Sequence, residues 1–494
     1  MSFISTFTSL SKRGWGSVST FVWVWIQEFL PANIWTPANG TGFGLKIAVG
    51  ENPNYLAISQ GDFGYLPLPS PIKTDSISLY LQTSGNYNFV TYLNPPVTVL
   101  GTVTASNSTF NTMTVSSTAG FYKNQGITFT GTLFGGVQSS SQYFIKDIVS
   151  STEFTIGEQQ SNAPSIPLTN GSGSMGMETS FYGWGINGLH INENSTVISF
   201  AADASMFMYT RSGSTWTMTQ QITDLSASDP TYGVYLVNSG VMDRSGDYML
   251  LTSGPGGGSG TAFIYFRSGS TWSLQQSIDI TALGYSNIQR ITMSGNGEYI
   301  SIITVTSVSG VFNLLVYNRS GTSWTLQQTI NFGTSLALGF ITISINGAGD
   351  TLAISKYVNP IEVFIYTRSG STWSLQQTIP QPTSPPAFGF SRTMWLNDPG
   401  DVLFIGAPNG GALKPPFFIY SSGIVLIYKL VNSTFTYSTY VTLPNDQYSL
   451  NSNFSFPAIA ASTSGNILGV ASSGGTDVPY QQIGQVDVFD RLNV

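Results

Sequence analysis

A short motif, Arg-Ser-Gly-Ser-Thr-Trp, recurs along the chain and limits its possible folds more than any other feature. Four copies occur, the third with Thr and Ser exchanged, and they begin at Arg211, Arg267, Arg319 and Arg368. Each copy ends in a tryptophan, and these are Trp216, Trp272, Trp324 and Trp373. The tryptophans are 56, 52 and 49 residues apart. Repetition at such a period indicates an array of similar supersecondary units.

Each unit contains four short runs of β-branched and aromatic residues, separated by turns rich in Gly, Asn and Asp. The clearest unit has its runs at Gly339–Ile345, Thr351–Ser355, Ile361–Tyr366 and Thr372–Ile379. The second run is almost continuously apolar, as expected for a strand covered on both faces. Four hairpin-linked strands in a unit of about 50 residues predict an all-β protein with the blades of a β-propeller.

The same template applied along the whole chain predicts seven blades. The first lies within residues 21–96, which also hold a closing strand, and the other six occupy residues 181–494. Residues 97–180 are predicted to be an inserted β domain with a linker, and residues 1–20 an N-terminal extension. The remaining boundaries fall near residues 225, 280, 332, 382 and 444.

The seventh blade lacks a fourth strand, because the chain ends after Gly484–Asp490. The segment Val22–Pro31 resembles Thr372–Pro380, with aromatic, Gln and apolar residues before a proline. We therefore predict that the N-terminal segment supplies the missing strand, which removes exposed sheet edges from the ring. The alternative is an interfacial anchor. A signal peptide is not favoured, since Gln27 and Glu28 interrupt the short apolar stretch.

The sixth unit resembles the FG-GAP repeat of integrin-α-type β-propellers. It contains Phe388-Gly-Phe-Ser391, then Asn397–Pro408 with a terminal Gly-Ala-Pro, and then Gly423–Tyr428. The tryptophan turn is also similar to the Asp-box of sialidases, with arginine at the aspartate position. That box is structural, so it does not favour an enzyme. We expect the Arg, Gly and Trp to lock each turn, with the Trp packed between blades.

The FG-GAP resemblance implies calcium loops, but these turns are poor in carboxylates. The corresponding segments are Asp243–Asp247, Ser294–Glu298, Asn346–Asp350 and Asn397–Asp401. We interpret them as β-turns in which a side chain accepts main-chain hydrogen bonds. No metal site and no cofactor is predicted.

The inserted segment has five expected strands, which predict a small β-sandwich or barrel. They are Thr102–Ser106, Thr112–Ser116, Ile127–Thr132, Gln142–Ile148 and Glu153–Ile156. The segment resembles a small module of bacteriophage tail and fibre proteins. The following stretch, Asn162–Gly176, is rich in Ser, Gly and Pro and is predicted to be a linker.

Composition excludes several kinds of function. Only 8% of residues are charged, and the net charge of −7 with no basic cluster argues against nucleic-acid binding. The chain has no cysteine and one histidine, which rules out disulfides and Cys/His zinc sites. That histidine, His190, lies in an expected strand and is interpreted as structural. No apolar run is long enough for a membrane span, and no catalytic residue is predicted.

Together these features favour a non-enzymatic virion structural or attachment protein, such as a phage tail, fibre or decoration component. Its expected partners are other virion proteins and a host-surface glycan or protein receptor, and its expected location is the virion. The first alternative is a secreted or cell-surface microbial adhesin. The second is a carbohydrate-active enzyme built on a propeller.

Overall fold

The computed structural model describes most of the chain, and the following account is confined to that part. The described residues are 21–29, 47–60, 76–123, 125–138, 141–158, 164–180, 187–202, 205–223, 236–253, 260–306, 311–333, 341–356, 360–385, 387, 389–407, 423–442, 459–472 and 485–493. The predicted extension, residues 1–20, lies outside these ranges, as do Phe388 and Pro408 of the FG-GAP-like unit.

The described strands outside the insert form four-stranded antiparallel sheets, seven in number, which we call blades 1–7. The first three are blade 1, with β2 (Ile47–Val49), β3 (Tyr55–Gln60), β4 (Ser76–Thr83) and β5 (Asn86–Leu93); blade 2, with β12 (Asn187–Ile191), β13 (Val197–Ala202), β14 (Ser205–Ser212) and β15 (Thr215–Thr223); and blade 3, with β16 (Leu236–Met242), β17 (Tyr248–Ser253), β18 (Thr261–Ser268) and β19 (Thr271–Asp279).

A 3-10 turn, η1 (Thr281–Leu283), leads into the next blades. These are blade 4, with β20 (Tyr285–Met293), β21 (Tyr299–Thr306), β22 (Phe312–Ser320) and β23 (Ser323–Gly333); blade 5, with β24 (Ile343–Ile345), β25 (Thr351–Lys356), β26 (Glu362–Ser369) and β27 (Thr372–Pro380); and blade 6, with β28 (Thr393–Leu396), β29 (Val402–Ala407), β30 (Ile424–Val431) and β31 (Thr434–Thr442).

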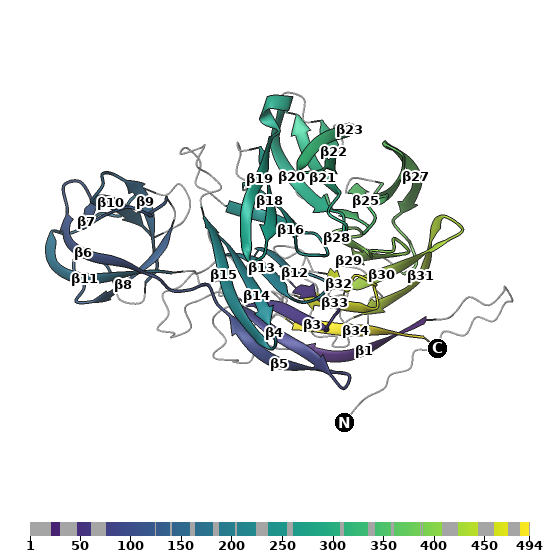
Figure 1. Ribbon diagram of the computed structural model, residues 1–494, viewed down its shortest axis with the longest axis horizontal. Coiled ribbons are helices and arrows are strands. Elements are labelled where there is room, and N and C mark those ends of the chain that lie inside the picture. The colour runs from purple at the N-terminus through teal and green to yellow at the C-terminus, as the bar shows by residue number, and fades with distance from the viewer. Residues whose placement is uncertain are drawn as a thin grey trace, which may run out of the picture.

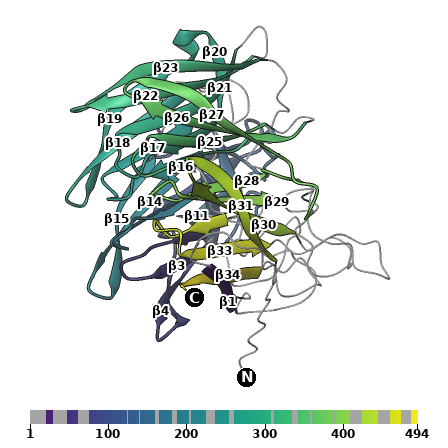
Figure 2. The same cartoon turned by 90° about the vertical axis from the view of Figure 1, so that its right-hand side faces the viewer.

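Blade 7 joins the two ends of the sequence. It consists of β32 (Ile459–Ala461), β33 (Ile467–Ser472), β34 (Gln485–Asn493) and, as its outer strand, β1 (Phe21–Phe29). Strand β1 pairs antiparallel with β34 from Phe21↔Asn493 to Phe29↔Val486. Figures 1 and 2 show these two strands side by side. The predicted closure by the N-terminal segment is confirmed, since that segment is a paired strand.

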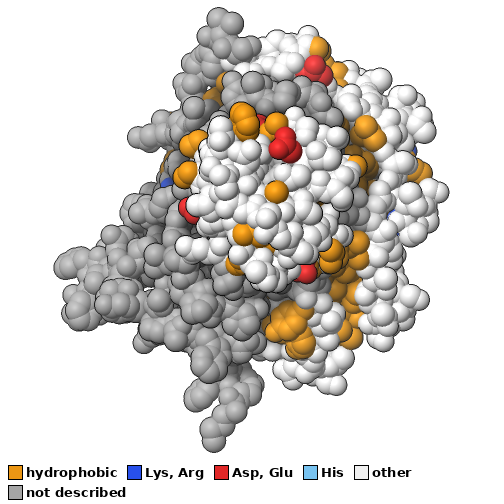
Figure 3. Space-filling view, turned by 90° about the vertical axis from the view of Figure 1, so that its left-hand side faces the viewer, with side chains coloured by type: hydrophobic (Ala, Val, Ile, Leu, Met, Phe, Trp, Pro, Cys, Tyr) orange, Lys and Arg blue, Asp and Glu red, His pale blue; other side chains and the backbone are white. Residues whose placement is uncertain are grey.

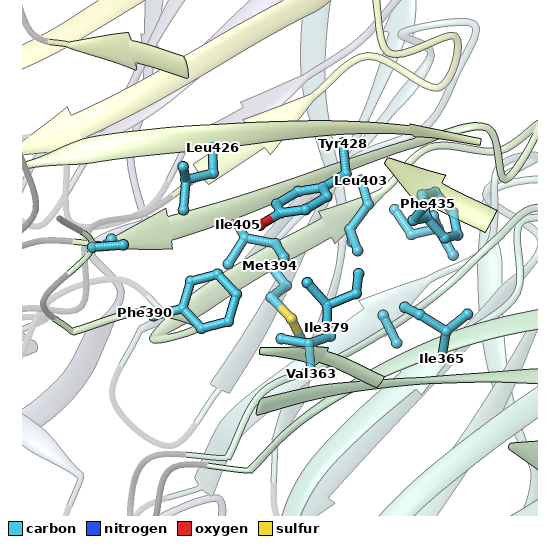
Figure 4. Packing of buried hydrophobic residues seen from close by; sticks show 14 of the residues in the cluster. Val363, Ile365, Ile379, Phe390, Met394, Leu403, Ile405, Leu426, Tyr428 and Phe435 are labelled. Atoms are coloured by element: carbon cyan, nitrogen blue, oxygen red, sulfur yellow. The ribbon is translucent and has the colours of Figure 1, made fainter. Parts of the chain in front are cut away.

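The innermost strands of the blades contact one another in a closed cycle, β2, β12, β16, β20, β24, β28, β32 and back to β2. The protein is therefore a β-propeller. Apolar side chains fill the space between successive blades, because each sheet can bury its faces only against its neighbours. Figure 4 shows one such cluster, in which Val363 and Ile365 of blade 5 meet Leu403, Leu426 and other side chains of blade 6.

The inserted segment forms a closed barrel between blades 1 and 2. Its strand order is β10-β7-β6-β11-β8-β9, and its strands are β6 (Val99–Asn107), β7 (Thr112–Val115), β8 (Gly126–Gly131), β9 (Tyr143–Ile148), β10 (Glu153–Gly157) and β11 (Gly171–Thr179). Its core is separate from the blades and includes Phe129, Phe154 and Met175. In Figure 1 the barrel projects from one side of the propeller. The expected small β domain is thus a barrel.

The predicted linker Asn162–Gly176 is wrong over its last part, because Gly171–Thr179 is strand β11. Met175 and Met177 of this strand are fully buried in the barrel core. The glycines of β11 allow neighbouring residues to pack closely against the strand, and they do not mark a flexible segment. A Cβ atom on Gly176 would lie 2.4 Å from Oγ1 of Thr130, and one on Gly171 would lie 2.9 Å from Phe134. Composition alone does not distinguish these two uses of glycine.

Candidate functional site

The turns between the first and second strands of the blades meet around the propeller axis. In blades 2–7, a polar side chain accepts two main-chain N–H groups from four and five residues further on, whereas blade 1 has Gly50 at this position. Asp243 Oδ1, for example, accepts from Asp247 and Tyr248 at 2.8 Å each. The same arrangement occurs at Asn192, Ser294, Asn346, Asn397 and Ser462. The interpretation of these segments as side-chain-stabilised turns is confirmed.

The residues that follow these positions link neighbouring blades into a ring of hydrogen bonds. The donor and acceptor pairs are Glu51 N to Glu193 O, Glu193 N to Arg244 O, Arg244 N to Gly295 O, Asn296 N to Gly347 O, Gly347 N to Asp398 O and Asp398 N to Thr463 O, each 2.9–3.1 Å long. The remaining step uses a side chain, since Ser464 N donates to Oε2 of Glu51 at 3.0 Å. We call these seven turns the axial ring.

Charged side chains from different turns of the axial ring form ion pairs with one another. Arg244 Nη1 lies 3.0 Å from Asp398 Oδ2, and Arg244 Nε lies 3.5 Å from Glu193 Oε2. The neighbouring positions are glycines, which leave room for the carboxylate: a Cβ on Gly347 would lie 2.7 Å from Cγ of Asp398. Burial raises the pKa of Asp398 to about 6, although Arg244 opposes the shift. Because one arginine contacts carboxylates from two other blades, the cluster links blades 2, 3 and 6.

His190 also joins two blades. It lies on β12, as predicted, and its Nε2 is hydrogen-bonded to the carbonyl oxygen of Gly240 on β16. Within the described part of the chain, no group of three or more His, Cys, Asp or Glu side chains is arranged to hold a metal ion. In the same residues, no helix has the length and hydropathy needed to cross a membrane.

In blades 2–5, the arginine of the repeated motif connects two turns of its own blade. One is the turn between the first and second strands, and the other is the turn between the third and fourth strands. Arg368 Nε donates to Gly349 O and its Nη1 to Gly370 O, both at 2.8 Å. Its guanidinium lies 4.3 Å from the ring centroid of Tyr299 in the preceding blade. Arg211, Arg267 and Arg319 make the same pair of turn contacts. The expected locking of the turns is confirmed, and Tyr299 shows that the lock extends to the neighbouring blade.

Glutamine side chains form a second link between blades, which sequence reasoning missed. Gln220 Nε2 donates to Trp272 O at 2.9 Å, and Trp272 N donates to Gln220 Oε1 at 2.7 Å. The same two-bond clamp joins Gln276 to Trp324, Gln328 to Trp373, Gln377 to Phe435 and Gln27 to Tyr87. The signal was the glutamine four residues after each tryptophan, but its target lies in the next blade.

The barrel is held against blade 2 on the side of the ring. Tyr122, which follows β7, packs against the core shared by blades 2 and 3, and its hydroxyl lies 3.4 Å from Oγ of Ser205. Phe110 precedes β7, at the opposite end of that strand, and is 71% exposed. Figure 3 shows this side of the molecule, with scattered hydrophobic side chains and few charged ones. Phe110 is therefore an exposed aromatic side chain at the end of β7 opposite Tyr122.

Comparison with known proteins does not assign a family. No protein-family model and no curated protein matches the chain. Among solved structures, the chain is similar to Sqt1 of Saccharomyces cerevisiae, with 9% identity, a TM-score of 0.42 and coverage of 93% of this chain and 98% of that one. A functionally unknown protein from Desulfotomaculum acetoxidans DSM 771 has 9% identity and a TM-score of 0.41, covering 71% and 89%. The periplasmic gluconolactonase PpgL of Pseudomonas aeruginosa has 9% identity and a TM-score of 0.36, covering 75% and 92%. Likenesses this weak say nothing about the activity of this chain.

Proposed function

We propose that the chain is a non-enzymatic structural or attachment protein of a virus particle, such as a phage tail, fibre or decoration component. The observation that carries the proposal is the mounting of a separate barrel on the side of a closed propeller. Tyr122 fixes the barrel at one end, and Phe110 is exposed at the other. A rigid ring with a side-mounted module suits a protein that holds one partner and presents a surface to another.

In this proposal the barrel docks to other virion proteins, and the propeller meets a host-surface glycan or protein. The low content of charged residues, 8%, supports contacts made by aromatic, amide and hydroxyl groups. Arg244 links Glu193 and Asp398 of two other blades, which suits a ring that serves as a rigid scaffold. We infer further that the blades are of the FG-GAP type and that the barrel is related to phage tail modules.

The test is quantitative mass spectrometry of virus particles and of the soluble and envelope fractions from the source culture. The proposal predicts that the protein co-purifies with capsid or tail proteins at a fixed ratio. Recovery in the soluble or envelope fractions alone would contradict it and favour a microbial adhesin. A second sample carries Phe110→Ser and tests docking by the barrel. We expect this variant to fold, because Phe110 is exposed, and to be less abundant in purified particles than the wild type.

A further inference from the structure

Exposed aromatic rings gather at two places on the outside of the propeller. Within the part of the chain that the structure describes, five aromatic side chains are at least 40% exposed, and they are Phe89, Tyr92, Phe110, Tyr437 and Tyr440. Phe110 belongs to the barrel, and the other four lie in pairs on the outer strands of blades 1 and 6, β5 and β31. The exposed rings are therefore clustered and not scattered over the surface.

On blade 1, three aromatic rings form one surface. Phe89 lies opposite Tyr80 on β4, with ring centroids 5.8 Å apart and ring planes at 75°. Tyr92 lies opposite Ser78, two residues along β4 from Tyr80, so it projects from the same face of the sheet. The ring centroids of Phe89 and Tyr92 are 4.7 Å apart. We call Tyr80, Phe89 and Tyr92 the blade 1 platform.

Blade 6 repeats this surface. Tyr437 lies opposite Tyr428 on β30, with ring centroids 5.8 Å apart and ring planes at 71°. Tyr440 lies opposite Leu426, again two residues along the partner strand, so it also projects from the same face. We call Tyr428, Tyr437 and Tyr440 the blade 6 platform. Blade 7 separates the two blades, so the platforms lie two blade positions apart around the ring.

The outer strands of blades 2–5 carry other residues at the two exposed positions. The first position is methionine in blade 2 and leucine in blades 3–5, and the second is glutamine, serine or threonine. In blade 3, for example, they are Leu274 and Ser277, and in blade 4 they are Leu326 and Thr329. A blade therefore forms without an aromatic residue at either position, and the fold does not account for the two aromatic pairs.

Both platforms are open to solvent and held by the preceding blade. Tyr80 packs on the core shared with blade 7, and Tyr428 packs on the core shared with blade 5, as Figure 4 shows for Tyr428. A glutamine clamp fixes the outer strand two residues before the first exposed ring, at Tyr87 in blade 1 and at Phe435 in blade 6. The four exposed rings thus project from a fixed main chain, which lowers the entropy lost on binding.

The platforms combine apolar rings with hydroxyl groups and lack charge. Neither β5 nor β31 contains a charged residue. Burial raises the pKa of Tyr80 and Tyr92 raises it further, just as burial and Tyr440 raise the pKa of Tyr437. The phenol groups of each pair therefore lie near one another. Each phenol can donate and accept a hydrogen bond beside the flat apolar surface of the rings.

We propose that each platform binds one sugar residue of a neutral glycan. The C–H face of a pyranose ring packs on aromatic rings, and its hydroxyl groups exchange hydrogen bonds with the phenols. An anionic glycan is disfavoured, because β5 and β31 provide no cation to offset the desolvation of its charge. This proposal deepens the proposed function and rests on it for the source of the glycan, the host surface.

The size of the platforms argues against a protein partner. Two half-exposed aromatic rings offer roughly 200 Å² of surface. A standard protein–protein interface buries about 800 Å² on each partner. The exposed area of one platform is therefore too small for a stable protein interface but matches the face of a single sugar ring.

The first experiment measures binding of neutral hexasaccharides to the purified full-length chain by isothermal titration calorimetry. The probes are cellohexaose, laminarihexaose, mannohexaose and chitohexaose, and a heparin hexasaccharide is the anionic comparison. We expect at least one neutral probe to bind at two sites on each chain, and the heparin probe not to displace it. Absence of binding by every neutral probe at millimolar concentration, or displacement by the heparin probe, would overturn the proposal.

Variants that copy the other blades then locate the sites. Phe89→Leu with Tyr92→Ser gives blade 1 the residues of blade 3, and Tyr437→Leu with Tyr440→Thr gives blade 6 the residues of blades 4 and 5. Thermal unfolding checks that both double variants fold, as expected for residues that occupy these positions in other blades. We expect each double variant to lose one of the two sites and the combined variant to bind about tenfold more weakly or not at all. Leu326→Ala, at the equivalent position of blade 4, should leave binding unchanged.

Two results of this series count against the platforms. Unaltered binding in the combined variant would place the glycan elsewhere, and an equal loss in Leu326→Ala would show that the aromatic rings have no special part. Particle association separates this inference from the proposed function, because docking to the particle is assigned to the barrel. A combined variant that loses glycan binding and still co-purifies with particles supports both, whereas a wild-type chain that binds glycan and is absent from particles overturns the proposed function alone.

Discussion

The carboxamide of Gln27 binds both main-chain groups of Tyr87, with Nε2 3.0 Å from the carbonyl oxygen and Oε1 2.8 Å from the amide nitrogen. These residues lie in β1 and β5, so the clamp connects the closing strand of blade 7 to blade 1. It repeats the geometry of Gln220 and Trp272 between blades 2 and 3. The N-terminal strand therefore completes one blade and also bonds to the next.

Replacing this glutamine should weaken the closure. Gln27→Leu removes both hydrogen bonds to the main chain of Tyr87, which is 3% exposed, and we expect a loss of about 1–3 kcal/mol in the free energy of unfolding. Denaturant unfolding measures the change. Gln138→Leu, at an exposed position in the barrel, is the control and should change stability by less than about 0.5 kcal/mol. Equal effects of the two variants would show that the clamp adds nothing to closure.

The arginine of the repeat should not be replaceable by lysine. Arg368→Lys keeps the charge but loses the planar group that reaches Gly349 and Gly370 together, so we expect a loss of about 1–2 kcal/mol. Thermal unfolding of Arg368→Lys and Arg368→Met provides the test. Similar losses in both variants fit a geometric role, whereas full stability in the lysine variant would point to charge alone. Lys123→Met, an exposed ion-pair residue in the barrel, serves as the control.

The packing of β11 predicts an unusual sensitivity to alanine. Gly176→Ala places a Cβ 2.4 Å from Oγ1 of Thr130, and the overlap should destabilise the barrel by about 1–3 kcal/mol. Thr130→Ala removes the clashing atom, so the double variant should recover most of the loss. Limited proteolysis of the barrel and its thermal transition report the effect. A neutral Gly176→Ala would mean that this segment does behave as a linker.

Stability should depend on pH through Asp398. Its pKa is about 6 in the folded protein against 3.8 for the free group, so the folded state binds the proton more tightly. The resulting stabilisation is fully present below pH 3.8 and is lost as the pH rises through about 6. Asp398→Asn should remove this part of the pH dependence when its unfolding curve is subtracted from that of the wild type.

Arg244 provides the complementary variant for the same measurement. The arginine lowers the pKa of Asp398, so Arg244→Gln should raise that pKa and move the loss of stability to higher pH. A wild-type curve without a decline between pH 4 and 6 attributable to Asp398 would contradict both expectations.

Much of the architecture could be predicted because the repeat carries local information. The spacing of the Arg-to-Trp motif sets the length of a blade, and alternation in runs such as Ile361–Tyr366 marks strands. The similarity of Val22–Pro31 to Thr372–Pro380 was enough to predict the closing strand. In each case a local pattern of residues has one main structural outcome.

The contacts between blades were decided only by the tertiary structure. Gln276 and Trp324 are 48 residues apart, and nothing local specifies that a carboxamide will meet that main chain. The same is true of Arg244 and Asp398, which come from different blades and meet at the axis. The sequence by itself determined the repeating strands, the closure and the poverty of charge. Which side chains face one another across the ring depends on the register and the cyclic order of the blades, because such contacts exist only after distant strands have packed together.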